Sequence, residues 1–230
     1  MSVKISHLSD AGQVLQAFRL SSPLGSLCGV ASPEGLCLLS FASPEEALAE
    51  FPLEFPTATR AELLRSLIEV TDDGAIADTG TARRPTAQLG SWLQLLRRYL
   101  HGESRQLEIP VDLRLARTPF HRAVYEQLLR VGPGQTTTYG DLARSVGRPL
   151  ASRAVGQAVG KNPVGLVIPC HRVLGKDGSL HGFAFGLAKK AALLQLEGVD
   201  AALVARSLGG GAKTTVTPRS WEREVRADSR

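Results

Sequence analysis

Short apolar runs separated by turn residues characterise the first part of the chain. Three such runs lie between residues 16 and 41, with the Pro- and Gly-containing segments 22–25 and 32–35 between them. Runs of this length bounded by tight turns are typical of antiparallel strands that pair with their neighbours. We therefore predict a meander of antiparallel strands. Cys28 and Cys37 fall inside these strands, either as buried core thiols or as metal ligands.

Helical periodicity replaces the strand pattern further along the chain. Ser43, followed by a proline and two glutamates, is a typical helix start. Residues 86–100 repeat apolar side chains every three or four positions, which predicts an amphipathic helix. Its apolar positions are Leu89, Trp92, Leu93, Leu96 and Leu100. Residues 107–112 have the pattern of a connector, so we predict an N-terminal α/β domain over residues 1–116.

Several short helices are predicted in the second block, residues 117–200. Thr118, followed by proline, starts a helix that continues to Arg130. Its apolar face consists of Val124, Leu128 and Leu129. Two shorter helices, residues 138–147 and 151–160, are joined by a tight turn, which is the helix-turn-helix outline. Many small helical domains that do not touch DNA match this outline as well.

The remaining elements complete an α/β (α+β) fold class. Residues 175–178 indicate a hairpin-type turn, and residues 187–196 indicate a final helix. The N-terminal domain is then an antiparallel sheet with helices, and the C-terminal domain is mainly helical. Residues 201–230 are rich in Gly, Thr and mixed charges without periodicity, so we predict a flexible tail there.

Composition places the chain among globular proteins without a membrane segment. Of its 230 residues 43% are hydrophobic and 21% are charged, and no apolar run approaches the roughly 18 residues that span a bilayer. The N-terminus lacks the pattern of a secretion signal. The three cysteines are too few and too widely spaced for a disulfide framework. We therefore expect a cytoplasmic protein, or a nuclear one if the source is eukaryotic.

Positive charge is concentrated in the second block. Residues 117–200 carry 11 Lys and Arg against 5 Asp and Glu, whereas the rest of the chain carries 16 against 17. This asymmetry is compatible with a polyanionic partner such as nucleic acid, and equally with a solvated basic surface.

The second helix of the helix-turn-helix outline, residues 151–160, is unusual for a helix that reads bases. Major-groove readers need several long polar side chains, but this helix carries mostly small residues and, near its start, the single long cation Arg153. Small residues allow close approach to another surface, which is either a neighbouring helix or a DNA backbone. One long side chain at the front suits insertion into a base stack better than sequence reading.

The candidate nucleophile is Cys170, which lies beside His171 in a short apolar run. A thiol becomes nucleophilic when its pKa is lowered or a base takes its proton, and histidine serves well near neutral pH. Adjacent residues of a strand point to opposite sides. A link between the two side chains must therefore run through a bend, a water or a third group. Taken alone, the pair is also compatible with a structural role.

The motifs of the second block resemble the C-terminal domain of the O6-alkylguanine-DNA alkyltransferases. The matching segments are residues 138–143, 153–158, 162–163, 168–173, 186–190 and 193–198. The Pro-Cys-His-Arg-Val string ending at Val173, with Asn162-Pro163 shortly before it, is the most specific of them. Weaker similarity at 22–25 and 34–36 extends the resemblance over most of residues 15–198. It implies a ribonuclease H-like N-terminal domain and a winged helix-turn-helix-like C-terminal domain.

This resemblance implies a single-turnover DNA repair reaction without a cofactor. Cys170 would accept the alkyl group from O6-alkylguanine, and also from O4-alkylthymine, in an irreversible step. His171 would relay the thiol proton through a water, and Glu197 would orient His171. Asn162 would hydrogen-bond to backbone near the nucleophile. Without the resemblance, Glu197 reads as a surface carboxylate at a helix end.

The resemblance also implies a monomer that binds the minor groove of double-stranded DNA and flips the damaged base. Arg153 would fill the vacated stack, and Tyr139 would turn the phosphate and donate to the base. Backbone at Cys170 and Val173 would accept from the guanine amine, and the Ala184 N–H would approach O6. The residues expected near phosphates are Ala151, Ser152, Lys161 and Lys176.

Four positions depart from the family pattern. Tyr125 stands where many relatives have Trp, and Phe183 stands where Tyr is usual at the pocket edge. Phe185 replaces a common Gly, so its ring either narrows the pocket or stacks on larger alkyl groups. Ser32 occupies a position that binds zinc in some relatives, so we expect no zinc.

Other classes explain the motifs less completely. A non-enzymatic lesion-binding protein of the alkyltransferase-like type would lack the nucleophile that Cys170 provides. A helix-turn-helix regulator would need base-reading side chains, and a generic Cys-His hydrolase would not need a DNA-binding block.

Overall fold

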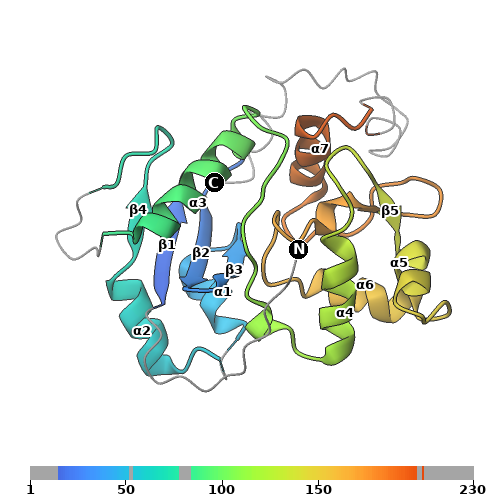
Figure 1. The fold of residues 1–230 in the computed structure, drawn as a ribbon, viewed down its shortest axis with the longest axis horizontal. Coiled ribbons are helices and arrows are strands. Elements are labelled where there is room, and N and C mark those ends of the chain that lie inside the picture. The colour runs from blue at the N-terminus through green and yellow to red at the C-terminus, as the bar shows by residue number, and fades with distance from the viewer. Residues whose placement is uncertain (1–14, 52–53, 78–83, 201–203, 205–230) are drawn as a thin grey trace. The chain divides into compact units, whose positions relative to one another are not determined.

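The computed structural model describes residues 15–51, 54–77, 84–200 and 204 (Figure 1). The described residues form two compact units. The first comprises the residues up to His101, together with Leu107–Arg117 and Pro163–Val167. The second comprises Gly102–Gln106, Thr118–Asn162 and the residues from Ile168 onward. The segment Pro163–Val167 therefore belongs with the first unit, although the sequence pattern places it in the second block.

The first unit is built on a four-stranded sheet in the order β3-β2-β1-β4. The strands are β1 (Gln16–Leu20), β2 (Leu27–Ser32), β3 (Gly35–Ser40) and β4 (Ile68–Val70). The pairs β1–β2 and β2–β3 are antiparallel, which confirms the predicted meander. The short strand β4 was not predicted, and it pairs parallel to β1. Three residues are too few to show a periodicity of two.

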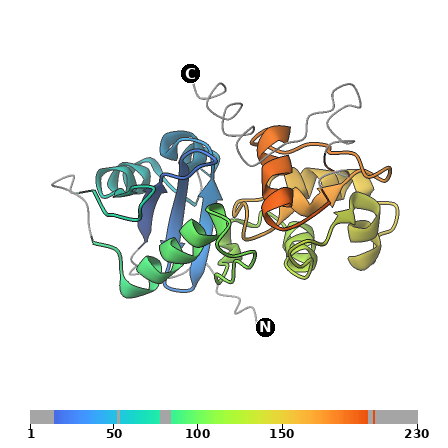
Figure 2. The same cartoon turned by 90° about the horizontal axis from the view of Figure 1, so that it is seen from above.

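Helices cover both faces of this sheet (Figure 2). They are α1 (Pro44–Ala49) and α2 (Thr57–Arg65) on one face and α3 (Ala87–Leu100) on the other. Ser43 caps α1 with a full capping box, as its sequence predicts. The predicted apolar positions of α3 are all buried, which confirms that helix. A short 3-10 helix, η1 (Leu113–Leu115), follows the connector.

Cys28 and Cys37 are buried core thiols, which confirms the first of the two sequence-based alternatives. Burial raises the pKa of each thiol to about 12. Thiols of this kind stay protonated and unreactive near neutral pH.

The α-helices of the second unit that the structure describes in full are α4 (Pro119–Leu128), α5 (Tyr139–Ser145), α6 (Ser152–Gly160) and α7 (Leu187–Leu196). Threonine side chains cap α4 and α5, since Thr118 Oγ1 accepts from the His121 amide and Thr138 Oγ1 from the Asp141 amide. Helices α5 and α6 form the predicted helix-turn-helix pair. The predicted face of α4 needs one correction, because Leu129 is half-buried at the C-cap whereas Tyr125 is fully buried.

Two short strands, β5 (Thr137–Thr138) and β6 (Val173–Leu174), pair in parallel in the second unit. The predicted turn at residues 175–178 is present, with Gly178 N donating to Gly175 O, but no strand follows it to complete a hairpin. The predicted tail lies mostly outside the described residues. Val204, however, is helical and fully buried. It packs in an apolar cluster with residues that include Leu174, Leu180 and Leu194.

None of the helices that the structure describes has both the length and the apolar character required to cross a membrane.

Candidate active site

The segment Pro163–Val167, which precedes the candidate nucleophile in the chain, is hydrogen-bonded to the sheet of the first unit. Leu39 N donates to Pro163 O at 2.8 Å, and Gly165 N donates to Leu39 O at 2.8 Å. Within the described residues, Leu166 is the one non-glycine residue with a positive φ, 67°. A branched side chain rarely adopts this conformation, so the backbone just before Cys170 is held in an uncommon shape by its surroundings.

Cys170 and His171 begin a 3-10 helix, η2 (Cys170–Arg172), and not a strand. Successive side chains of a 3-10 helix are about one third of a turn apart. The two side chains are therefore not forced to opposite sides, as they would be along a strand. This bend is one of the three arrangements that the sequence left open for a link between the thiol and the imidazole.

Asn162 lies at the other end of the nucleophile turn. Its Nδ2 donates to Ile168 O at 2.8 Å, across the turn that precedes Cys170. The same side chain hydrogen-bonds to the Cys170 sulfur, which lowers the pKa of the thiol. Asn162 thus spans the turn and touches both the backbone and the sulfur.

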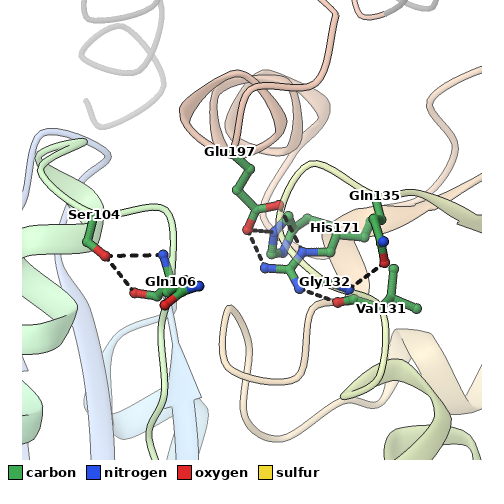
Figure 3. A network of polar contacts seen from close by, with 8 residues as sticks. Ser104, Gln106, Val131, Gly132, Gln135, His171 and Glu197 are labelled. Carbon is green, nitrogen blue, oxygen red and sulfur yellow. Dashed lines mark hydrogen bonds and ion pairs between the residues drawn. The ribbon is translucent and has the colours of Figure 1, made fainter.

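A buried polar cluster lies behind the nucleophile. His171 Nε2 is 3.0 Å from Glu197 Oε1, and both side chains are fully buried. Arg172 holds the same carboxylate with two hydrogen bonds, from Nε to Oε2 at 2.8 Å and from Nη2 to Oε1 at 2.6 Å. A third donor of this guanidinium, Nη1, binds Val131 O. Figure 3 shows Glu197 reaching from the end of α7 toward His171, with Val131 on the neighbouring loop.

This cluster keeps Glu197 ionised and leaves one imidazole nitrogen open. Burial raises the pKa of Glu197, but the hydrogen bonds and charges of His171 and Arg172 outweigh it and lower the pKa to about 2. A carboxylate only accepts, so His171 Nε2 carries the proton and Nδ1 carries the lone pair. His171 Nδ1 is buried without a hydrogen-bond partner among the described residues.

The thiol and the imidazole are both neutral in the resting protein. Burial raises the pKa of Cys170, and the hydrogen bond from Asn162 and the charge of Lys190 only partly oppose it. Burial likewise lowers the pKa of His171, against the opposing effect of Glu197. Cys170 therefore keeps its proton in the resting protein.

Lys190 supplies a buried positive charge near the sulfur. Its side chain is fully buried, and Nζ donates at 2.6 Å to each of two carbonyl oxygens, Val173 O and His181 O. Burial lowers the pKa of this amine to about 8, although the charge of Cys170 acts in the opposite direction. Lys190 therefore joins β6 to the following loop and favours a negative charge on the sulfur.

The loop between β6 and α7 carries the predicted pocket residues. Phe183 and Phe185 are half-buried and stack edge to face, with ring centroids 5.2 Å apart. Ala184 between them is exposed. Tyr139 stands close by, because a Cβ built on Gly182 would lie 3.8 Å from its hydroxyl. Burial and the nearby Cys170 raise the pKa of Tyr139, so the structure brings this predicted residue toward the sulfur.

The other predicted residues lie on or near helix α6. Arg153 and Lys161 are exposed, whereas Ala151 and Ser152 are half-exposed at the start of the helix. The N-cap residue Ala151 makes no side-chain cap. Lys176 is exposed in the turn after β6, and Val173 is buried. Leu150, just before α6, is fully exposed at 100%.

The sequence analysis gave no role to Arg172 or Lys190, although both lie in the motifs that carry the resemblance. One sequence feature indicates that they are buried and paired, namely a charged residue among apolar neighbours. Arg172 interrupts the apolar run from Val164 to Leu174, and Lys190 precedes the buried pair Ala191 and Ala192. Long charged residues are almost never fully buried unless they are paired.

Ser32, the predicted departure from a zinc site, is part of a different buried arrangement. Its Oγ donates to Asp112 Oδ2 at 2.7 Å, and Asp112 also pairs with Arg114 at 2.6 Å. Within the described ranges, His, Cys, Asp and Glu side chains form no group of three that could hold a metal ion.

The fold and the site together define a class of protein in which a cysteine, a histidine and a buried carboxylate are combined with a helix-turn-helix. Comparison with known families agrees with this class. The protein-family model described as "6-O-methylguanine DNA methyltransferase, DNA binding domain" matches residues 119–199.

Relatives extend the similarity to both units. The methylated-DNA–protein-cysteine methyltransferase of Mycolicibacterium paratuberculosis is 39% identical over 140 residues, which is 61% of this chain and 83% of that protein. The inducible enzyme of the same name from Bacillus subtilis is 46% identical over 99 residues, or 43% of this chain and 54% of that protein. The chain belongs to the methylated-DNA–protein-cysteine methyltransferase family.

A solved structure supports the same architecture. Mycobacterium tuberculosis OGT in complex with DNA is 31% identical, with a TM-score of 0.58, and the match covers 82% of this chain and 98% of that one. The expected two-part α/β architecture is thereby confirmed.

Proposed function

We propose that this chain repairs alkylated DNA by transferring the alkyl group of O6-alkylguanine to Cys170. The observation that carries the proposal is the buried His171–Glu197–Arg172 cluster directly beside Cys170. It leaves His171 Nδ1 without a hydrogen-bond partner among the described residues, on the residue that follows the neutral thiol of Cys170. A nucleophile, a base and a group that orients the base are the parts that cysteine chemistry requires.

The proposed reaction conserves atoms and charge. The Cys170 proton passes through a water to His171 Nδ1, while Glu197 accepts the Nε2 hydrogen bond and stabilises the imidazolium. The thiolate attacks the alkyl carbon in line, so that the S–C bond forms as the C–O6 bond breaks. The departing guanine anion takes up one proton from water, and the His171 imidazolium returns to water the proton that it received from Cys170, so the thiol proton balances the one gained by guanine. The Ala184 N–H stabilises the charge that develops on O6.

The reaction is irreversible and occurs once per molecule. The S–C bond of a thioether is stable, because a thiolate is a poor leaving group. The other two cysteines, Cys28 and Cys37, are buried in the sheet of the first unit. The reaction as written needs no cofactor. O4-alkylthymine carries its alkyl group in an equivalent chemical setting, and we propose it as a second substrate.

The start of α6 is the proposed DNA-contacting surface. Arg153, Lys161 and Lys176 are exposed cations, and Ala151 and Ser152 offer small side chains at the start of the helix. Small residues suit close approach in a minor groove, and the exposed Leu150 offers an apolar contact of the kind that minor-groove proteins use. We propose that one molecule acts alone, flips the damaged base and fills the gap with Arg153.

Mass spectrometry of the intact protein tests the proposal. We expect the wild-type chain, mixed with a duplex that contains O6-methylguanine, to gain the mass of one methylene. Peptide mapping is expected to locate the gain at Cys170. The lesion-binding alternative predicts binding without any mass change. An unchanged mass after complete binding would therefore reject the enzymatic proposal.

Arg153→Ala is expected to slow repair of duplex DNA by roughly 10- to 100-fold, because flipping costs a few kcal/mol that the inserted side chain offsets. Repair of the free base O6-methylguanine should be unchanged. Arg144→Ala is the matched control. It removes an equally exposed cation from α5 and should weaken binding only through charge. Equal losses on duplex and free base would remove the stack-filling role of Arg153.

A further inference from the structure

Tyr125 is a fully buried residue of α4 whose hydroxyl group reaches the end of α6. Its Oη lies 2.9 Å from Ala158 O and 2.8 Å from Lys161 O. Lys161 is the C-cap residue of α6. Ala158 O already accepts from the Lys161 amide. Lys161 O lies at the helix end, where the last carbonyl groups have no intrahelical donor, so the Tyr125 hydroxyl supplies a donor to Lys161 O that the helix does not.

The carbonyl that Tyr125 holds belongs to the peptide unit that begins Asn162. Lys161 C and O and Asn162 N lie in one rigid plane, because the peptide bond does not rotate freely. The Asn162 side chain, attached to the Cα atom at the end of that plane, donates to Ile168 O at 2.8 Å and hydrogen-bonds to the Cys170 sulfur. A rotation of the plane would therefore displace Asn162 from both partners.

We propose that Tyr125 is a positioning residue for alkyl transfer: its hydroxyl fixes the Lys161–Asn162 peptide plane and thereby holds Asn162 against the nucleophile turn and the Cys170 sulfur. The role in alkyl transfer rests on the proposed function. The effect on Cys170 does not, because it concerns the reactivity of the thiol itself. Two links connect α4 with the reacting atom, the Tyr125–Lys161 hydrogen bond and the contact of Asn162 with Cys170, while the Asn162–Ile168 hydrogen bond holds the turn beside them.

Other groups also act on this thiol. Lys190 contributes a positive charge, and the imidazole of His171 follows Cys170 directly. Neither of these two effects depends on the position of Asn162. Removing the Tyr125 hydroxyl should thus change the Asn162 contribution and leave these two in place.

Tyr125→Phe is the test, because it removes one oxygen and keeps the ring. We expect methyl transfer from free base and from duplex DNA to slow by a similar factor, roughly three- to tenfold, as for the loss of one net hydrogen bond. The pH profile of Cys170 alkylation by iodoacetamide, followed by peptide mapping, should shift to higher pH. Mapping separates Cys170 from the buried Cys28 and Cys37.

Two controls separate positioning from folding. Val124→Ala truncates a neighbouring buried residue of α4 that has no polar side-chain atom. It should lower the melting temperature without moving the pH profile. In the double variant, Tyr125→Phe should add little to Asn162→Ala, because both changes disable the same contact.

An unchanged transfer rate and pH profile in Tyr125→Phe would overturn the proposal. A double variant whose transfer rate falls by the product of the two single-variant factors, for Tyr125→Phe and Asn162→Ala, would overturn it as well. If the wild-type chain transfers no alkyl group from DNA while the iodoacetamide profile still shifts in Tyr125→Phe, the proposed function fails and the positioning role stands.

Discussion

Cys170→Ser is expected to abolish alkyl transfer, with a loss of more than roughly 10³-fold. The serine side chain is almost the same size, but its hydroxyl has a far higher pKa than a thiol. Burial also lowers the pKa of His171, so the imidazole is a weaker base than usual, and a hydroxyl is much harder to deprotonate than a thiol. Incubation with an O6-methylguanine duplex, followed by measurement of the protein mass, checks the expected loss.

The same variant separates binding from transfer. The exposed residues of α6 are untouched in Cys170→Ser, so affinity for the damaged duplex should stay within a few-fold of the wild type. Cys28→Ala is the matched control, because that thiol is buried in β2 with a pKa raised to about 12. It should transfer the methyl group normally. Transfer by Cys170→Ser at a wild-type rate would place the acceptor on another residue.

Local sequence signals account for most of the first unit. The turns at 22–25 and 32–35 separate the strands as predicted, and Ser43 caps α1 with Glu46 in a capping box. These features depend on neighbouring residues, which a pattern records directly. The parallel pairing of β1 with β4 depends on residues about 50 positions apart, so no local pattern contains it.

The candidate site is likewise predicted only in part by neighbouring residues. The Cys170–His171 pair is visible in the sequence, but whether His171 can act as a base depends on Glu197, which contacts His171 although it lies 26 positions away. The family resemblance supplied that partner, whereas the residues alone favoured a surface carboxylate, and the structure shows Glu197 buried. The catalytic roles themselves stay predictions until the variants are measured.

For three buried residues, neither the sequence pattern nor the family resemblance predicted the hydrogen-bond partners. Arg172, Lys190 and Tyr125 each donate to oxygen atoms more than eight positions away. Each compensates for a polar group that folding removes from water, and such groups must be paired wherever the chain buries them. Their partners are set by how α4, α6 and α7 pack, and this information is absent from any one segment.

Arg172→Met is expected to lower the free energy of unfolding by about 3–5 kcal/mol, because it leaves a buried carboxylate with one partner fewer. Arg172 donates two hydrogen bonds to Glu197, and both side chains are more than nine-tenths buried. Urea unfolding measures the loss. Arg144→Met is the control: Arg144 pairs with Asp141 on the surface, with side chains 65% and 49% exposed, so its removal should cost at most about 1 kcal/mol.

Acid unfolding provides an independent check of the same pair. The pKa of Glu197 is lowered from its ordinary 4.5 to about 2 in the folded protein. Its contribution to stability is therefore complete above pH 4.5 and is lost as the pH falls toward 2. Arg172→Met should weaken this dependence, and adding Glu197→Gln to Arg172→Met should restore part of the lost stability by removing the under-compensated charge. If the double variant is instead less stable by the full sum of the two single losses, the two side chains are not energetically coupled, and the buried ion pair does not explain why Arg172 is needed.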